Sequence, residues 1–275
     1  MHRKYLTKKL EAAILIMGLV AAQPTFFASA ETSVPKEKDG IQLVFAESDD
    51  AIAGDQKKSE QFHITMMTYQ HDFKTKKGKV YKKISYEYPL ANGDSAAVAT
   101  FNNFFEKQQK KWVKSAKKNL DSAKQDVKEI ESDAGICYSD AVTCELVQNE
   151  KYISVLQTGY DYTLGAHGIP YRMSYLFIAD TGENISAAKI LGITKKELNN
   201  KVSKLFLNKY NKSKDSDKSP FFNSEVISAK EIKKFLGKMD FSDCCYLKNG
   251  KLCFYADPYA LGPYASGFIE VTMKL

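Results

Sequence analysis

The chain has 275 residues, of which 44% are hydrophobic and 12% aromatic, and its formal net charge is +7. This length allows one large or two modest domains, and the apolar fraction excludes a globally disordered chain. The positive charge suits contact with anionic wall polymers or lipid headgroups, but it is too weak for a nucleic-acid-binding signature, so we expect no nucleic-acid partner.

Residues 1–30 have the pattern of a secretory signal peptide. The basic segment MHRKYLTKK precedes the apolar run Ala12–Ala22, and small residues follow at Ala28–Ala30. This order predicts cleavage after Ala30. A retained membrane anchor is the alternative, but the run is shorter than the roughly 18 apolar residues that a spanning helix needs. We therefore expect a secreted, extracytoplasmic protein of the cell wall or periplasm, with no stable membrane span after cleavage.

Changes in composition divide the remaining chain into a linker and two modules. Residues 31–59 are mostly polar and are expected to form the linker. Residues 60–165 are predicted to form an N-terminal α+β module, and residues 166–275 a C-terminal α+β module.

The N-terminal module is predicted to begin with two strands and a long helix. Segments 61–73 and 79–90 are rich in aromatic and β-branched residues and are joined by a lysine-rich turn. After them Phe101, Phe105 and Trp112 recur at spacings that place them on one helix face. These apolar side chains are expected to pack against the sheet.

The opposite face of this helix is basic. The helix is expected to begin at Asp94 or Ser95, whose side chains are good N-caps. Opposite Trp112 the chain carries six lysines between Lys107 and Lys118. Such a face could contact teichoic acids or a membrane, and a solvated helix surface is the simpler interpretation.

Three further strands are predicted to form an antiparallel meander. Segments 136–148, 152–164 and 169–180 alternate apolar and polar residues and are separated by short turns. An antiparallel arrangement can keep one face in contact with water.

An amphipathic helix over 194–210, a short helix over 228–237, a hairpin and a last strand follow. Capping boxes mark both helices, one formed by Thr194 with Glu197 and the other by Ser228 with Glu231. Strands and helices therefore cluster along the chain and do not alternate. This order predicts an α+β fold, with antiparallel sheets, helices packed on one face, and two closely associated modules.

The five cysteines are odd in number, and their spacing matches no zinc site. A two-residue turn at 249–250 would set Cys253 opposite Tyr246. Cys244 would then lie diagonally across from Cys253, which is poor disulfide geometry for that pair. Cys137 and Cys144 are predicted to lie in one strand, which would hold them over about 20 Å apart. We expect mostly reduced, buried thiols, no metal site and no cofactor.

Three segments together resemble the extracellular region of the lysozyme-sensing anti-sigma factor RsiV. The same paired modules precede the catalytic domain of the peptidoglycan deacetylase PdaC. The segments are YEYPLANGDSAAVATFNNFFEKQ (86–108), the stretch 152–191 that contains Gly-Ala-His-Gly, and LCFYADPYALGPYASGFIEVTM (252–273). The family usually carries two glycines before Ala-His-Gly, where this chain has Leu164 and Gly165.

The resemblance implies a non-catalytic, exported α+β module that binds something at the cell surface. An anti-sigma factor needs a cytoplasmic domain before its membrane helix, and a deacetylase needs a metal-binding catalytic domain. The sequence shows neither pattern, so we expect the sensing or binding module by itself.

His167 has no sequence context that indicates catalysis. The histidines His63, His71 and His167 show no metal-ligand spacing, and no nucleophile elbow is present. The simplest interpretation of His167 is a turn in which Gly165 and Gly168 take backbone conformations that other residues avoid. If the turn binds a ligand, the rigid aromatic loop near the C-terminus is the natural second contact. The ligand-binding hypothesis names Gly165, His167, Gly168, Asp257, Tyr259 and Tyr264.

The sequence therefore favours a cell-envelope binding module over an enzyme. Its expected partner is a lysozyme-like protein, peptidoglycan or an anionic wall polymer. One alternative is a glycan-acting hydrolase that uses Asp161, Asp257 or Glu270, which would require two carboxylates in one cleft. The other is a membrane-tethered envelope sensor with an uncleaved N-terminus.

Overall fold

A computed structural model of the chain describes residues 63–130, 135–223 and 225–275. The predicted signal peptide and the predicted linker lie outside these residues. Of the helices that the structure describes, none is both long and apolar enough to cross a bilayer.

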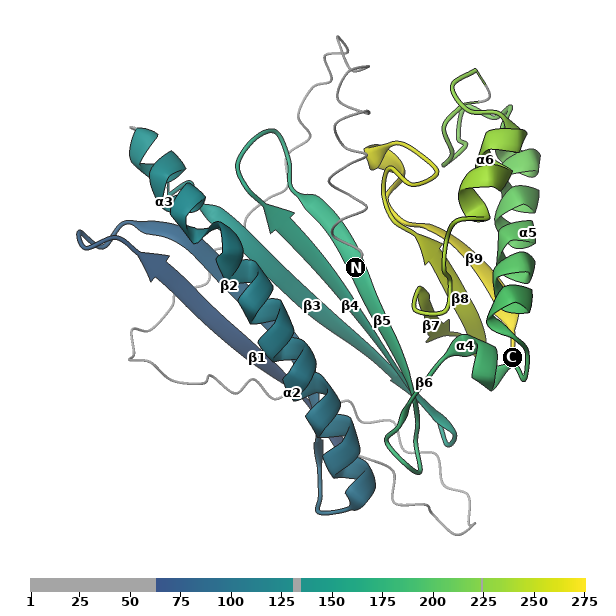
Figure 1. Ribbon diagram of the computed structural model, residues 1–275, viewed down its shortest axis with the longest axis horizontal. Coiled ribbons are helices and arrows are strands. Elements are labelled where there is room, and N and C mark those ends of the chain that lie inside the picture. The colour runs from purple at the N-terminus through teal and green to yellow at the C-terminus, as the bar shows by residue number, and fades with distance from the viewer. Residues whose placement is uncertain (1–62, 131–134, 224) are drawn as a thin grey trace. The chain divides into compact units, whose positions relative to one another are not determined.

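The first part of the fold is a six-stranded sheet whose strands follow chain order from β1 to β6 (Figure 1). Neighbouring strands are antiparallel except β2 and β3, which run parallel. This pair differs from the expected all-antiparallel sheet, because a long helical crossover joins the two strands and parallel pairing needs such a connection. The strands are β1 His63–Lys74, β2 Val80–Asn92, β3 Tyr138–Gln148, β4 Tyr152–Tyr162, β5 Ile169–Ile178 and β6 Asn184–Ile185.

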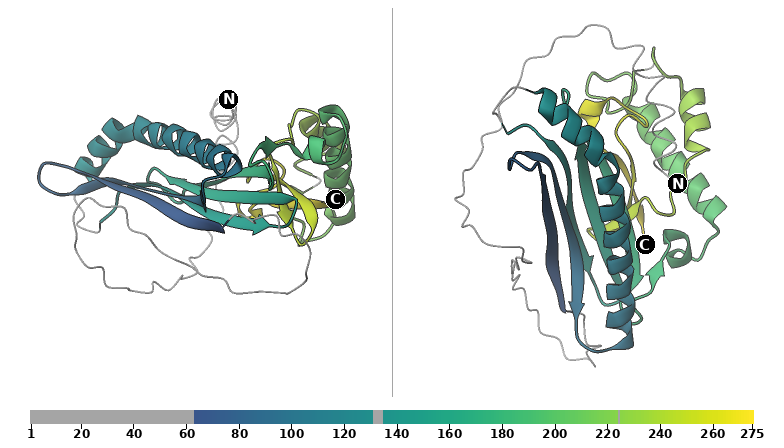
Figure 2. Two further views of the ribbon diagram at one scale, coloured as in Figure 1. Left: turned by 90° about the horizontal axis from the view of Figure 1, so that it is seen from below. Right: turned by 60° about the vertical axis from the view of Figure 1, so that its left-hand side comes forward.

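The crossover forms a helical layer on one face of this sheet (Figure 2, left). It consists of α2 (Ala96–Ala116), the short η2 (Lys117–Asn119) and α3 (Leu120–Glu129). Ser95 caps α2, since its hydroxyl accepts a hydrogen bond from the Val98 amide at 3.2 Å. The predicted stripe is buried as expected, and it continues beyond α2 in α3. Its buried members are Val98, Phe101, Phe105, Trp112, Ala116, Ala123 and Val127.

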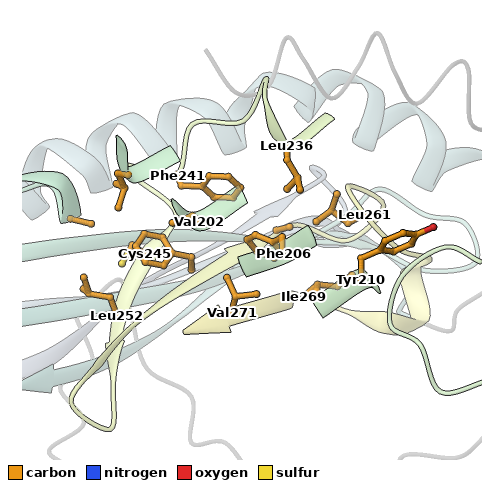
Figure 3. Packing of buried hydrophobic residues seen from close by; sticks show 14 of the residues in the cluster. Val202, Phe206, Tyr210, Leu236, Phe241, Cys245, Leu252, Leu261, Ile269 and Val271 are labelled. Atoms are coloured by element: carbon orange, nitrogen blue, oxygen red, sulfur yellow. The ribbon is translucent and has the colours of Figure 1, made fainter. Parts of the chain in front are cut away.

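The second part of the fold is a three-stranded antiparallel sheet with helices packed against it. Both predicted capping boxes are present, at the start of α5 and of α6. Aromatic and aliphatic side chains of these helices pack against the sheet in a hydrophobic core (Figure 3). The elements are α4 Ala187–Ile190, α5 Lys195–Ser213, α6 Ala229–Leu236, β7 Cys245–Lys248, β8 Lys251–Ala256, η3 Tyr264–Ser266 and β9 Ile269–Lys274.

The β7–β8 hairpin has the predicted register. Asn249 and Gly250 have φ angles of 51° and 69°, as the two central residues of a type I′ turn require. Tyr246 therefore lies opposite Cys253. All five cysteines are free thiols, but only Cys245 and Cys253 are buried as expected; the other three are partly exposed.

Side chains of the larger sheet bond to the backbone of β7. The Ser154 hydroxyl accepts a hydrogen bond from the Leu247 amide at 2.8 Å, and the Ser174 hydroxyl accepts one from the Cys245 amide at 2.9 Å. In the structure β5 belongs to the six-stranded sheet. The division into modules at residues 165 and 166 stays a prediction.

Candidate functional site

The turn between β4 and β5 presents His167 at the surface. His167 is exposed, and its Nδ1 atom lies 2.9 Å from the Gly168 carbonyl oxygen. Gly165 has a φ angle of 104°, which favours glycine, as predicted. Leu164 also has a positive φ angle, 68°, an unfavourable conformation for a bulky side chain. The leucine that departs from the family pattern therefore stands at a position that suits glycine.

Gly168 is small for a different reason from the one the sequence indicated. Its φ angle is not positive, but a Cβ atom there would lie 2.6 Å from ring atoms of Tyr160. The Gly168 amide donates a hydrogen bond to the Tyr160 hydroxyl at 2.7 Å. The missing side chain thus lets Tyr160 lie against the turn.

The loop between β8 and β9 brings its tyrosines to the same place. The ring of Tyr264 stacks on the ring of His167, with 4.0 Å between centroids and 22° between planes. Tyr259 has a φ angle of 65°, and its ring centroid lies 5.8 Å from that of Tyr264. The two segments named as candidates from the sequence are therefore in direct contact.

Tyr160 is a member of this cluster that sequence reasoning missed. Its side chain is 39% exposed, and its hydroxyl is hydrogen-bonded to Tyr264 as well as to the turn. Burial and the neighbouring Tyr160 hydroxyl raise the pKa of Tyr264 above its usual value, so the Tyr264 phenol stays neutral at physiological pH. An aromatic residue at the end of a strand that leads into the histidine turn was the available signal. We name Tyr160, His167, Tyr259 and Tyr264 the aromatic platform.

The candidate carboxylates Asp257, Glu270 and Asp161 differ in their contacts. The main-chain carbonyl of Asp257 accepts a hydrogen bond from the Ala260 amide at 3.0 Å, so Asp257 begins a turn. Glu270 forms an ion pair with Arg172 at 2.6 Å and accepts a hydrogen bond from the Tyr246 hydroxyl at 2.7 Å. Although burial raises it, these two donors hold the pKa of Glu270 below its usual range. Glu270 thus serves as an ionised structural partner.

Asp161 belongs to a different cluster, at the pairing of β3 with β4. It lies opposite Asp140 and hydrogen-bonds it, and Asp140 forms an ion pair with Lys82 at 2.9 Å. Lys82 and Asp140 are both buried. Within residues 63–130, 135–223 and 225–275, no three His, Cys, Asp or Glu side chains form a group that could hold a metal ion.

The described residues form an α+β fold that carries the aromatic platform at its surface. Two family models match it in succession. Residues 74–170 match the model described as deacetylase PdaC, and residues 189–275 match the model described as a protein of unknown function, DUF3298. These matches fit a PdaC/RsiV-like extracellular module of unknown function. DUF3298 is a family of unknown function, so its match assigns no activity to this chain.

Two solved structures of DUF3298 family proteins are similar to this chain, and the first of them shares its fold. One from Bacteroides fragilis has a TM-score of 0.51 at 14% identity, covering 78% of this chain and 90% of the other. One from Pseudomonas aeruginosa has a TM-score of 0.47 at 11% identity, covering 78% and 91%. No curated protein matches the chain.

Proposed function

We propose that the protein is a non-catalytic binding module of the bacterial cell envelope. Its ligand is a lysozyme-like protein or peptidoglycan, and the aromatic platform is the contact surface. The stacking of Tyr264 on His167 carries this proposal, because it joins two loops that are 97 residues apart into one preformed surface. Rigid aromatic side chains bind at low entropic cost.

The chemistry of the platform suits recognition better than reaction. Its rings present flat apolar faces with hydroxyl and imidazole groups at their edges, which is the mixture that favours aromatic residues at binding hot spots. Two of the three carboxylates that a hydrolase would use have other partners: Glu270 bonds Arg172 and Tyr246, and Asp161 bonds Asp140. These contacts support binding over glycan hydrolysis.

Binding to purified sacculi and to immobilised lysozyme tests the proposal. H167A and Y264A should each weaken retention on one of the two ligands by roughly 30-fold, as expected for an aromatic hot spot worth about 2 kcal/mol. Y264F keeps the stacked ring, so its retention should fall less than that of Y264A. H71A is the matched control, because His71 is another exposed histidine in an aromatic contact, with Phe73 on β1.

Retention by neither ligand, or equal loss in H167A and H71A, would contradict the proposal. Export is proposed with it, since PdaC-associated domains are typically extracytoplasmic. Mass spectrometry of the exported protein should find a mature start at Glu31, and an intact N-terminus would favour a tethered sensor.

A further inference from the structure

A dense row of lysines covers the solvent side of the α2–η2 helix. In α2, Glu106 is the only acidic residue, and the next acidic residue along the chain is Asp121. The lysines alternate with the buried stripe that contains Trp112, so they project from the side facing away from the sheet. We name as the lysine face Lys107, Lys110, Lys111, Lys114, Lys117 and Lys118, all of which are exposed.

The charges of the lysine face are largely uncompensated. Lys110 pairs with Glu106 one helical turn away, and the Nζ atom of Lys117 lies 5.9 Å from the centroid of the Phe73 ring. The other four form no ion pair with a described residue. Each lysine also lies three or four residues from at least one other. Such like-charge pairs destabilise a helix, so the arrangement does not serve the stability of α2.

The spacing of these lysines makes their charges act together. Neighbours three or four residues apart on a helix are about 5–6 Å apart at Cβ, which is less than the Debye length of about 8 Å at physiological ionic strength. From Lys107 to Lys118 the row extends about 17 Å along the helix axis. Several successive anionic groups of one chain-like ligand would fit along it.

We propose that the lysine face binds a linear polyanion of the phosphodiester type. A membrane surface is the less suitable partner, because interfacial helices insert large apolar side chains beside their lysines. The exposed large hydrophobic residues of the described chain lie elsewhere, and none is in α2, η2 or α3; they are Ile136, Val147, Tyr160, Val226 and Leu275. A flexible polymer can follow a single convex helix and release its counterions on binding. The proposal is independent of the aromatic platform.

Titration with long-chain inorganic polyphosphate at several salt concentrations tests the proposal. The wild type should bind with an affinity that falls steeply with salt. In K111Q/K114Q/K118Q the affinity should fall by about tenfold or more. The slope of log affinity against log salt concentration should become less steep by about 2, since each lost phosphate contact removes roughly 0.7 from that slope. The thermal midpoint of this variant should not fall, because the exchange relieves repulsion on an exposed surface.

K201Q/K204Q/K212Q is the matched control. These three lysines are exposed on α5 and form no described ion pair, so the variant has the same net charge as the first. The affinity of this control variant for polyphosphate should stay within about twofold of the wild-type affinity in the salt range where counterion release dominates binding. H167A should also bind polyphosphate normally, which separates this inference from the proposed function.

Three outcomes would overturn the inference. Equal losses in both triple variants would show that net charge alone attracts polyphosphate. No binding by the wild type at low salt would exclude a polyanion site. Tighter binding to phosphatidylglycerol vesicles than to polyphosphate would show that the lysine face meets a lipid surface.

Discussion

A buried ion pair gives one residue, Asp140, an unusual response to pH. Burial and the hydrogen-bonded Asp161 raise the pKa of Asp140 to about 6, and the ion pair with Lys82 only partly opposes them. The unfolded chain titrates this group near its ordinary value of about 3.9. The folded state therefore binds the proton more tightly than the unfolded state between these two values.

The sign of the effect on stability follows from this difference. The stabilising contribution of Asp140 is complete below pH about 3.9 and is lost as the pH rises through about 6, a change of roughly 2–3 kcal/mol in the free energy of unfolding. D140N has no such group, so its stability relative to the wild type should improve by that amount between pH 4 and pH 7. Urea unfolding at each pH measures it.

A control at a surface carboxylate separates this effect from the general influence of pH. Asp121 is exposed on α3, and D121N should follow the wild-type pH profile. If the wild type and D140N showed parallel profiles from pH 4 to pH 7, the carboxyl group of Asp140 would be ionised throughout and the explanation would be wrong.

At the scale of elements, one amide side chain connects α2 to the end of β2. Asn102 accepts a hydrogen bond from the Ala91 amide and donates one to the Ala91 carbonyl, each at 2.8 Å. This pair reproduces the bonds that a neighbouring strand would make. N102A should therefore lower the free energy of unfolding by about 2–4 kcal/mol, because two backbone groups of a buried residue lose their partner.

The adjacent residue supplies the control for this prediction. Asn103 is exposed on the same helix, and N103A should change stability by no more than about 0.5 kcal/mol. Urea midpoints of the two variants make the comparison. Similar values for N102A and N103A would mean that water replaces the Asn102 amide at no cost.

Sequence patterns predicted the elements well where the signal is local. The capping residue Ser95, the box of Thr194 with Glu197, and the hairpin register of Tyr246 with Cys253 all depend on contacts within a few residues. The parallel pairing of β2 with β3 was not predicted, because it depends on where a long crossover returns the chain. Lys82 was not predicted to be buried either, since the carboxylate that compensates its charge, Asp140, comes from β3, which follows only after the long crossover.

The candidate site shows the same limit. The turn at His167 and the loop at Tyr264 could each be recognised from their glycines and prolines. Their stacking could not, because 97 residues separate them and only the packing of the second sheet brings them together. Tyr160 was missed because an exposed tyrosine on a strand is ordinary until its hydrogen-bond partners are known.

At the scale of the whole described structure, Arg172 is the main charged connection between the sheets. It projects from β5, forms an ion pair with Glu270 of β9 at 2.6 Å, and lies over the Phe268 ring with its guanidinium carbon 4.1 Å from the centroid. The side chains of Arg172 and Glu270 are 16% and 27% exposed. Arginine suits this position, because its planar group can pair with a carboxylate and stack on an aromatic ring at once.

Replacing Arg172 should therefore loosen the connection between the sheets. R172M leaves Glu270 without its cation and should cost about 2–3 kcal/mol, below the usual range for fully buried pairs because both side chains retain some contact with water.

One local reporter can follow each sheet in urea. Fluorescence of Trp112 reports on the six-stranded sheet, and mass-spectrometric labelling of the Cys253 thiol reports on the three-stranded sheet. In the wild type the two transitions should coincide, whereas in R172M the thiol should become reactive at lower urea. K195M breaks an exposed ion pair and should leave both transitions almost unchanged. Coincident transitions in R172M, at the wild-type midpoint, would show that the hydrogen bonds and apolar contacts between the sheets suffice without the arginine.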